Sequence, residues 1–247
     1  MGTTADKLNR LLEIKANIKQ AIRDKGVYVG DYDTFAEYPH FIDLIETGGT
    51  DEFLAMRTMN GTNMSCLFYN YPGTTLDVSN LDVSNATDIS GMFETCQRLQ
   101  TLTGLNTWDT KNVTKMGNMF YTCPSLTSLD LSSFDTSKVT DMIMMFSYCS
   151  KLETLDIRNF DMGNVTDAHT TSYMFGGCDK LQELRLDNCD NDTINKIITS
   201  EEFPTNIITG VTRTIYCKEE NLGDLEAPEN WIFVDSYGHE IIPEPIE

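Results

Sequence analysis

The chain has 247 residues, of which 18 are Lys or Arg and 38 are Asp or Glu, so its formal net charge is −20. A surface of this charge repels nucleic acids and anionic membranes, and both are expected to be poor partners. No apolar run approaches the roughly 20 residues of a transmembrane helix, so no membrane insertion is expected, and the polar first residues predict no secretory signal.

The first predicted element is a helix over residues 3–25. Thr3 and Asp6 imitate a capping box, the interior has no Gly or Pro, and Gly26 provides a stop. Four residues on its narrow apolar face form a candidate oligomer seam: Leu11, Ile14, Ile18 and Ala21. This pattern leans toward trimers or tetramers, with a homotrimer favoured. Two heptads are short, however, and packing on the protein's own domain is the alternative.

A second short helical segment is expected from Thr34 to Glu46, before the break at Gly48-Gly49. The helix that ends in Lys25-Gly-Val, followed by Thr34-Phe-Ala-Glu-Tyr-Pro39, resembles the N-terminal segments of bacteriophage tail and head fibre proteins. The resemblance implies that residues 1–48 attach the chain to other virion proteins or make it oligomeric.

A repeat dominates the middle of the chain. The pair Met-Phe recurs at intervals of 26 to 29 residues, and three residues after each Phe comes a Cys. The Met-Phe pairs are Met92-Phe93, Met119-Phe120, Met145-Phe146 and Met174-Phe175, and the cysteines are Cys96, Cys123, Cys149 and Cys178. A period of this length is typical of stacked repeat architectures. Because the cysteines share an apolar position, we expect buried free thiols and no zinc site.

Each repeat is expected to contain one short strand and one short helix. The strand has the pattern Leu-x-Leu, as in Leu129-Asp-Leu131, and the spacing of Met142, Met145, Phe146 and Cys149 predicts a helical face. Thr140 is the expected N-cap of that helix. One unit buries too few large side chains to offset the entropy of ordering some 26 residues, so stacking of units is expected.

The run from Leu129 to Met142, with Met145-Phe146 and Cys149, resembles the BspA-type leucine-rich repeat of bacterial surface proteins and mycoplasma lipoproteins. The resemblance covers about residues 64–190. It implies an α/β fold, a leucine-rich-repeat solenoid of about five repeats of 25–29 residues with short parallel strands and short helices. The second unit departs from the pattern by an extra residue at Gly104.

Four regions are predicted: an N-terminal helical segment (1–48), the solenoid (49–189), a C-terminal cap (190–235) and an extended acidic tail (236–247). A solenoid exposes its core at each end unless it is capped. Within the cap, we expect strands over Thr212–Cys217 and Trp231–Val234, and the apolar run Ile194–Ile198 is compatible with a helix.

No nucleophile-base pair, phosphate loop or histidine metal motif is visible, so neither an enzyme nor a cofactor is predicted. The candidate ligand face consists of the strand positions between inward leucines: Asp77, Asp130, Asp156 and Arg185. Adjacent repeats are expected to bring these side chains into a ladder about 5 Å apart. Stacked like charges repel, which favours a ligand, but a solvated acidic face without one is the simpler alternative.

Two further acidic groups have their own interpretations. The column Asp82, Asp109, Asp135 and Asp161 is expected to form Asx-turns. The cluster of Asp187, Asp190 and Asp192 lacks the Gly and spacing of an EF-hand, so calcium is not favoured there.

Together these observations predict a non-enzymatic phage virion protein of fibre or decoration type. Its repeat domain would bind a bacterial surface glycan or protein, and its localisation would be the virion. The alternative is a bacterial cell-surface adhesin of the BspA type, for which we would expect an export signal.

Overall fold

The computed structural model describes residues 62–79, 81–206 and 208–241. The chain divides into two compact units, Met1–Met56 and Arg57–Glu247, and all described residues belong to the second. The predicted N-terminal helix, its seam of Leu11, Ile14, Ile18 and Ala21, the fibre-like segment, and residues 242–247 of the predicted tail lie outside the described residues.

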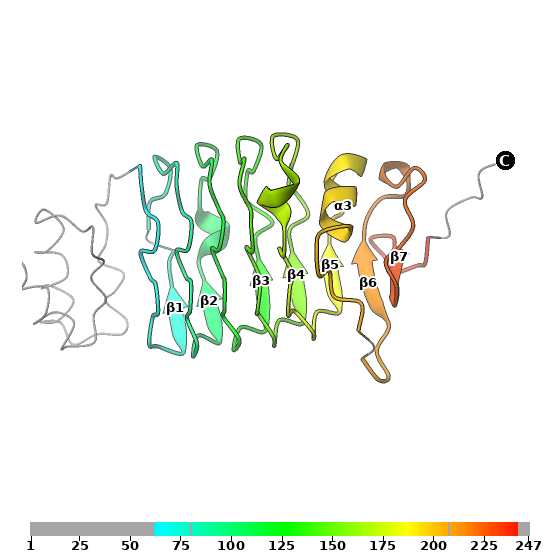
Figure 1. Ribbon diagram of the computed structural model, residues 1–247, viewed down its shortest axis with the longest axis horizontal. Coiled ribbons are helices and arrows are strands. Elements are labelled where there is room, and N and C mark those ends of the chain that lie inside the picture. Colours follow the sequence, from blue (N-terminus) through cyan, green and yellow to red (C-terminus); the bar gives the residue numbers. More distant parts are fainter. Residues whose placement is uncertain (1–61, 80, 207, 242–247) are drawn as a thin grey trace, which may run out of the picture. The chain divides into compact units, whose positions relative to one another are not determined.

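The described chain has a mixed α/β fold built on short parallel strands (Figure 1). The strands are β1 (Thr75–Asp77), β2 (Thr101–Thr103), β3 (Ser128–Asp130), β4 (Thr154–Asp156), β5 (Glu183–Arg185), β6 (Arg213–Tyr216) and β7 (Trp231–Val234). Strands β1 and β2 form one sheet, and β3 to β7 form a second, five-stranded sheet in sequence order. Every one of these pairings is parallel. Within each sheet, a strand is paired with the strand that precedes or follows it in the chain.

The apolar residue at the centre of each strand explains which face is buried. Leu129, Leu155 and Leu184 are paired in register and buried, and their strand neighbours on either side point away from the core. The same row continues into Ile215 and Phe233 of β6 and β7. The predicted strands at 212–217 and 231–234 are therefore confirmed, and they extend the sheet.

The only α-helix in the described residues is α3 (Asn191–Ile198), which contains the predicted apolar run. Asp190 is its N-cap, and its carboxylate accepts a hydrogen bond from the Thr193 N–H at 2.8 Å. The described residues also contain three short 3-10 segments: η2 (Leu105–Thr107), η3 (Ala168–Thr171) and η4 (Glu219–Asn221). None of these helices is long and apolar enough to span a bilayer.

The prediction of a helix in each repeat is wrong. In the unit that contains Phe146, the N–H of Met145 bonds to Met142 O and that of Cys149 to Phe146 O, as in consecutive turns. Met144 and Tyr148 have φ of 52° and 61°, a left-handed conformation that interrupts a helix. The intervening N–H of Phe146 instead donates to Met174 O in the next unit, at 2.9 Å. We call the segment Met142–Cys149, and the equivalent segment of each other repeat, the turn side.

The predicted helix cap at Thr140 is wrong for the same reason. Its hydroxyl donates to the carbonyl of Thr114 at 3.3 Å, and the Thr114 hydroxyl donates to the carbonyl of Thr87 at 3.0 Å. The Thr87 hydroxyl donates to Thr62 O in the same way. The threonine column therefore joins successive repeats instead of capping helices.

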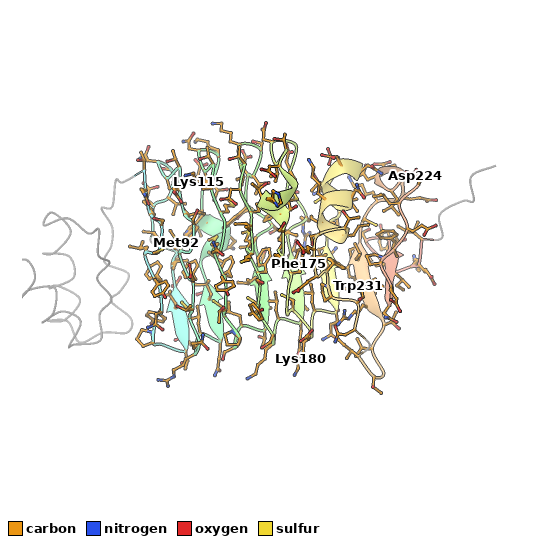
Figure 2. All side chains as sticks on the ribbon, viewed as in Figure 1. Met92, Lys115, Phe175, Lys180, Asp224 and Trp231 are labelled. Atoms are coloured by element: carbon orange, nitrogen blue, oxygen red, sulfur yellow. The ribbon has the colours of Figure 1, made fainter. Side chains whose placement is uncertain are left out.

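A stack of phenylalanine rings runs through the core between the strands and the turn side. Successive centroids lie 5.4 to 5.8 Å apart, and the ring planes are within 20° of parallel. The stacked rings are Phe68, Phe93, Phe120, Phe146 and Phe175. Phe203 then meets Phe175 edge-on, and Trp231 is tilted against Phe203; Phe175 and Trp231 are labelled in Figure 2. Each ring therefore has its main partners in neighbouring repeats, as the stacking argument requires.

The column cysteines are free and buried, as predicted. Each thiol lies against the carbonyl of the Phe in the preceding repeat, with S–O distances of 3.0 to 3.2 Å. Burial raises the pKa of the Cys178 thiol to about 12. These side chains therefore act as small apolar residues with one satisfied donor each.

The extra residue at Gly104 coincides with the break between the two sheets. Gly104 has φ of 90°, and a Cβ there would lie 2.2 Å from the Ser79 nitrogen, so only glycine fits. The chain then forms η2 before it enters the next unit. Across this break the turn side is continuous. The backbones of Lys115 and Asp141 form a parallel β-bridge, and the Phe120 N–H donates to Met145 O.

The last strand, β7, does not present a bare edge over its whole length. Glu240 forms an antiparallel bridge with Val234, and the Ile241 N–H donates to Phe233 O at 2.8 Å. The buried Arg213 donates to the carbonyls of Pro204 and Asp179 and lies over the Trp231 ring. Arg213 and Trp231 lie within the predicted cap, whereas Glu240 and Ile241, which cover the edge of β7, fall in the region predicted as an extended tail.

Replacing Phe120 tests the ring stack. Phe120→Ala removes a fully buried ring that contacts Phe93 and Phe146, so the free energy of unfolding should fall by about 3–5 kcal/mol in urea denaturation. Tyr237→Ala is the control, because that ring is 84% exposed. A loss below about 1 kcal/mol for Phe120→Ala, similar to that of a surface change, would contradict the role of the stack.

Candidate binding site

Three of the four residues predicted as a ligand face are neighbours on the five-stranded sheet. The register pairs Asp130 with Asp156, and Asp156 with Arg185, and Tyr216 follows Arg185 in the same row. Asp77 is not part of this row, because it pairs with Thr103 in the separate two-stranded sheet. We call Asp130, Asp156, Arg185 and Tyr216 the polar strand row.

The carboxylates of the row have partners within the protein. Asp130 accepts the Ser132 N–H at 3.0 Å, as Asp77 accepts the Ser79 N–H at 2.9 Å, which turns the chain as it leaves the strand. Asp156 forms an ion pair with Arg158 and raises the pKa of that guanidinium. Pairing of Asp156 with Arg158 weakens the like-charge repulsion on which the sequence argument for a ligand was based.

Arg185 is held in place by contacts with two other side chains. Its guanidinium forms two hydrogen bonds with the Asp187 carboxylate, at 2.9 and 3.1 Å. Its Cζ atom lies 4.5 Å from the centre of the Tyr216 ring, so a cation–π contact holds it from the other side. A planar cation fixed in this way can present its remaining N–H groups to a ligand at little entropic cost.

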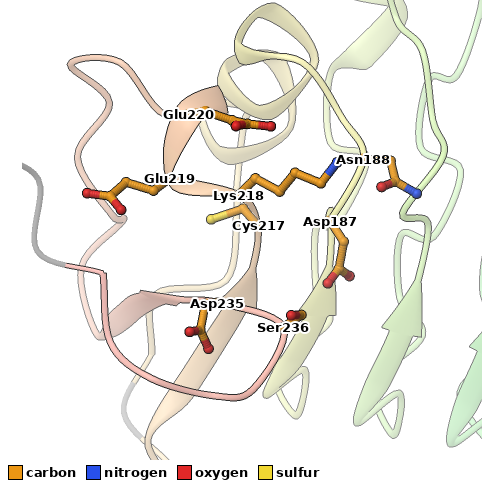
Figure 3. Close-up of a pocket in the computed structure, with 8 residues that line it drawn as sticks. All are labelled: Asp187, Asn188, Cys217, Lys218, Glu219, Glu220, Asp235 and Ser236. Atoms are coloured by element: carbon orange, nitrogen blue, oxygen red, sulfur yellow. The ribbon is translucent and has the colours of Figure 1, made fainter.

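A pocket of about 610 Å³ adjoins this end of the row (Figure 3). It lies where the chain leaves β5, β6 and β7, because the carboxyl ends of parallel strands meet at one edge of the sheet. The lining residues are Asp187, Asn188, Cys217, Lys218, Glu219, Glu220, Asp235 and Ser236. None of them was predicted as a binding residue, and Asp187 was named only as part of an acidic cluster in which calcium was not favoured. Each nevertheless follows one of the three strands by four residues or fewer.

The chemistry of the pocket suits binding by hydrogen bonds. Asp187 is already bound to Arg185, and Asp235 accepts N–H groups from Tyr237 and His239, which hold its pKa below the usual value. Burial raises the pKa of Cys217 to about 12, so its thiol is a poor nucleophile. Acceptor oxygens and one Lys therefore line a pocket that fits hydroxyl groups or cationic groups.

The predicted acidic cluster does not converge on one point. Asp187 pairs with Arg185, Asp190 caps α3, and Asp192 pairs with Lys196 at 2.6 Å. Among the described residues, no group of three or more His, Cys, Asp or Glu side chains is arranged to hold a metal ion.

The four aspartates predicted as Asx-turns form them. The acceptors are Asp82, Asp109, Asp135 and Asp161, and each carboxylate accepts the N–H of the residue two positions later, at 2.8 to 3.3 Å. This confirms a structural role for the column and removes it from the candidate ligand-binding residues.

Comparison with known proteins gives one match. The family described as "Mycoplasma protein of unknown function, DUF285", which is related to BspA-like repeat proteins, matches residues 62–189, slightly more than half of the chain. The match covers nearly the same residues as the predicted repeat resemblance. No curated protein and no solved structure matches the chain.

The Asx-turn carboxylates make the free energy of unfolding depend on pH in the acidic range. Hydrogen bonds from Ser84 and from Ser137 lower the pKa of Asp82 and Asp135 below the ordinary value of 3.8. Their contribution is therefore complete above the unfolded-state pKa and is lost as the pH falls through the lower folded-state pKa. The stability from urea denaturation should thus fall as the pH is lowered through the acidic range below about pH 4.

The double variant Asp82→Asn with Asp135→Asn is the matched test, since Asn keeps an acceptor oxygen for the turn but does not titrate. It should lose less stability over this pH interval than the native chain does. Equal acid sensitivity in both proteins would show that these two turns do not contribute.

Proposed function

The chain belongs to the DUF285 family, and we propose that it is a non-enzymatic recognition protein whose polar strand row binds a bacterial surface glycan or protein. We further propose that its repeats form a solenoid of the leucine-rich type. Support for the solenoid comes from one parallel strand per repeat in sequence order, the continuous ring stack, and backbone hydrogen bonds between successive units.

The observation that carries the binding proposal is the placement of Arg185. The side chain is held between Asp187 and Tyr216, at the junction of the polar strand row and the pocket. An extended ligand lying across the strands would meet one row residue per strand, about 4.8 Å apart. Such a ligand could place one group in the pocket, where acceptor oxygens suit the hydroxyls of a sugar or the side chains of a peptide.

We propose a virion location because residues 1–48 resemble the N-terminal segments of phage fibre proteins. In this proposal, that segment binds other virion proteins and holds a homotrimer together through Leu11, Ile14, Ile18 and Ala21. Joining several weak sites in this way can raise the overall affinity by about 10²–10⁴. The second candidate, a bacterial cell-surface adhesin, draws on the family's relation to BspA-like repeat proteins.

Location can be tested by mass spectrometry of purified phage particles and of washed cell envelopes from the producing host. The virion proposal predicts peptides of this chain in the particles at a constant ratio to a major structural protein. Peptides confined to the envelope fraction would favour the adhesin and contradict the virion location. A cytosolic marker protein, absent from both fractions, controls for contamination.

Binding can be tested on an array of purified bacterial surface polysaccharides, together with envelope proteins from the same strains. Loss of a charge-assisted hydrogen bond costs about 1.5–3 kcal/mol, so Arg185→Ala should weaken binding at least about tenfold. Arg185→Lys should give an intermediate loss, because it keeps the charge without the planar fork. Equal binding by the native chain and both variants would rule out this face as the site.

Lys111→Ala is the matched control, since this exposed cation pairs only with Asp109 and is not part of the row. Circular dichroism and urea denaturation of each variant show whether a loss reflects binding or stability. Arg185→Ala leaves Asp187 without its ion-pair partner. The stability of this variant must therefore be compared directly with that of the Arg185→Lys variant.

A further inference from the structure

An exposed aromatic ring is held rigidly on the turn side. Tyr148 is 53% exposed, and only Val211 and Tyr237 among the large apolar side chains of the described residues are similarly open to solvent. Tyr121 meets the Tyr148 ring edge-on at 5.9 Å, and a Cβ added at Gly177 would lie 2.9 Å from a ring carbon of Tyr148. The ring is therefore braced on both sides while much of its surface stays open.

Three cations share one repeat position close to this ring in the sequence. Arg98, Lys151 and Lys180 each lie two residues after a column cysteine and three residues before a strand. They are all exposed, and Figure 2 shows Lys180 at the edge where the strands begin. This edge is opposite the pocket, which lies where the strands end. We call these three residues the basic row.

The basic row has no partners within the described part of the chain. No carboxylate oxygen lies within 4.0 Å of its nitrogens, although Glu153 and Asp179 are close in sequence. By contrast, Lys111, Lys196 and Arg158 each form an ion pair. In a chain with a net charge of −20, carboxylates are abundant, so cations left unpaired in one column keep their charge available for a ligand.

The spacing of the row fits a linear ligand. Lys151 and Lys180 occupy adjacent repeats, and Arg98 lies two repeats before Lys151, with Ser125 between them. Adjacent parallel strands are about 4.8 Å apart, which applies to the steps from Ser125 to Lys151 and from Lys151 to Lys180. The step from Arg98 to Ser125 crosses the break between the two sheets, where the Ser125 hydroxyl donates to the Gln97 carbonyl at 2.8 Å. Tyr148 lies three residues before Lys151 in the same repeat and offers an exposed aromatic ring to a ligand.

We propose that Tyr148 and the basic row form a second binding site, which takes an acidic saccharide chain with phosphate or carboxylate groups. A sugar ring packs on Tyr148, and the anionic groups of neighbouring units pair with Lys151, Lys180 and Arg98. Duplex DNA and anionic bilayers fit less well, because their dense charge would also face the acidic remainder of the surface. The proposal does not depend on the polar strand row.

The test measures binding of the full chain to a poly(glycerol phosphate) bearing sugar substituents, to polygalacturonate and to neutral dextran, over a range of salt concentrations. At least one charged polymer should bind and dextran should not; the polymer that binds identifies the anionic group.

Lys151→Ala with Lys180→Ala should reduce the slope of log K against log salt by about 1.4, about 0.7 for each lost cation. Tyr148→Ala should weaken binding about tenfold.

Two matched controls separate the site from general charge and exposure effects. Lys111→Ala with Lys138→Ala removes the same charge from other exposed positions, and Tyr237→Ala removes an exposed ring elsewhere. Neither control should change the slope or the affinity. The proposal is overturned if neither charged polymer binds, if the control pair has the same effect as the test pair, or if single-stranded oligothymidylate binds as tightly as the saccharides.

Arg185→Ala distinguishes the two sites. It should leave binding of the acidic polymers unchanged, whereas the basic-row variants should leave binding at the polar strand row unchanged. Loss of acidic-polymer binding in Arg185→Ala alone would assign the polymer to the strand row and overturn the second site.

Discussion

The stack of phenylalanine rings and the hydrogen bonds that cross between repeats make each unit depend on its neighbours. Phe120 has its ring partners in the units on either side, and every second N–H of the turn side donates outward, as Phe146 does to Met174. A single unit in water would expose an aromatic ring and give up those bonds. The strand register, the column cysteines and the threonine column all depend on this alignment of successive repeats.

Alignment of the repeats also decides how the surface is organised. Residues at the same position of successive repeats form a row. Where that position is exposed and takes no part in core packing, the row can carry charged side chains across several repeats. The edge where the strands end has Arg185, Asp187 and the acidic pocket. The edge where they begin has the exposed cations Lys151 and Lys180, which form no ion pair with the described residues. The same scaffold therefore separates two kinds of surface chemistry without any change in its core.

The turn side shows where a periodic pattern is ambiguous. Large side chains at Met142, Met145, Phe146 and Cys149 have the three- and four-residue spacing of a helix. Consecutive turns also advance by about three residues, and they bury the same side chains. Side-chain spacing alone cannot tell whether an N–H bonds within its own segment or to the next repeat. The left-handed residues Met144 and Tyr148, which are not glycines, gave no warning.

Local and repeated features could be predicted from the sequence by itself: the repeat length, the inward leucines, the buried thiols, and the Asx-turns at Asp82 and Asp135. Each depends on residues close together in the chain or on one repeated column. Only the tertiary structure decided that Asp77 is separated from the polar strand row and that Arg185 is held by Asp187 and Tyr216. It also placed Lys218 and Asp235 in one pocket, because register and the meeting of strand ends depend on contacts between distant residues.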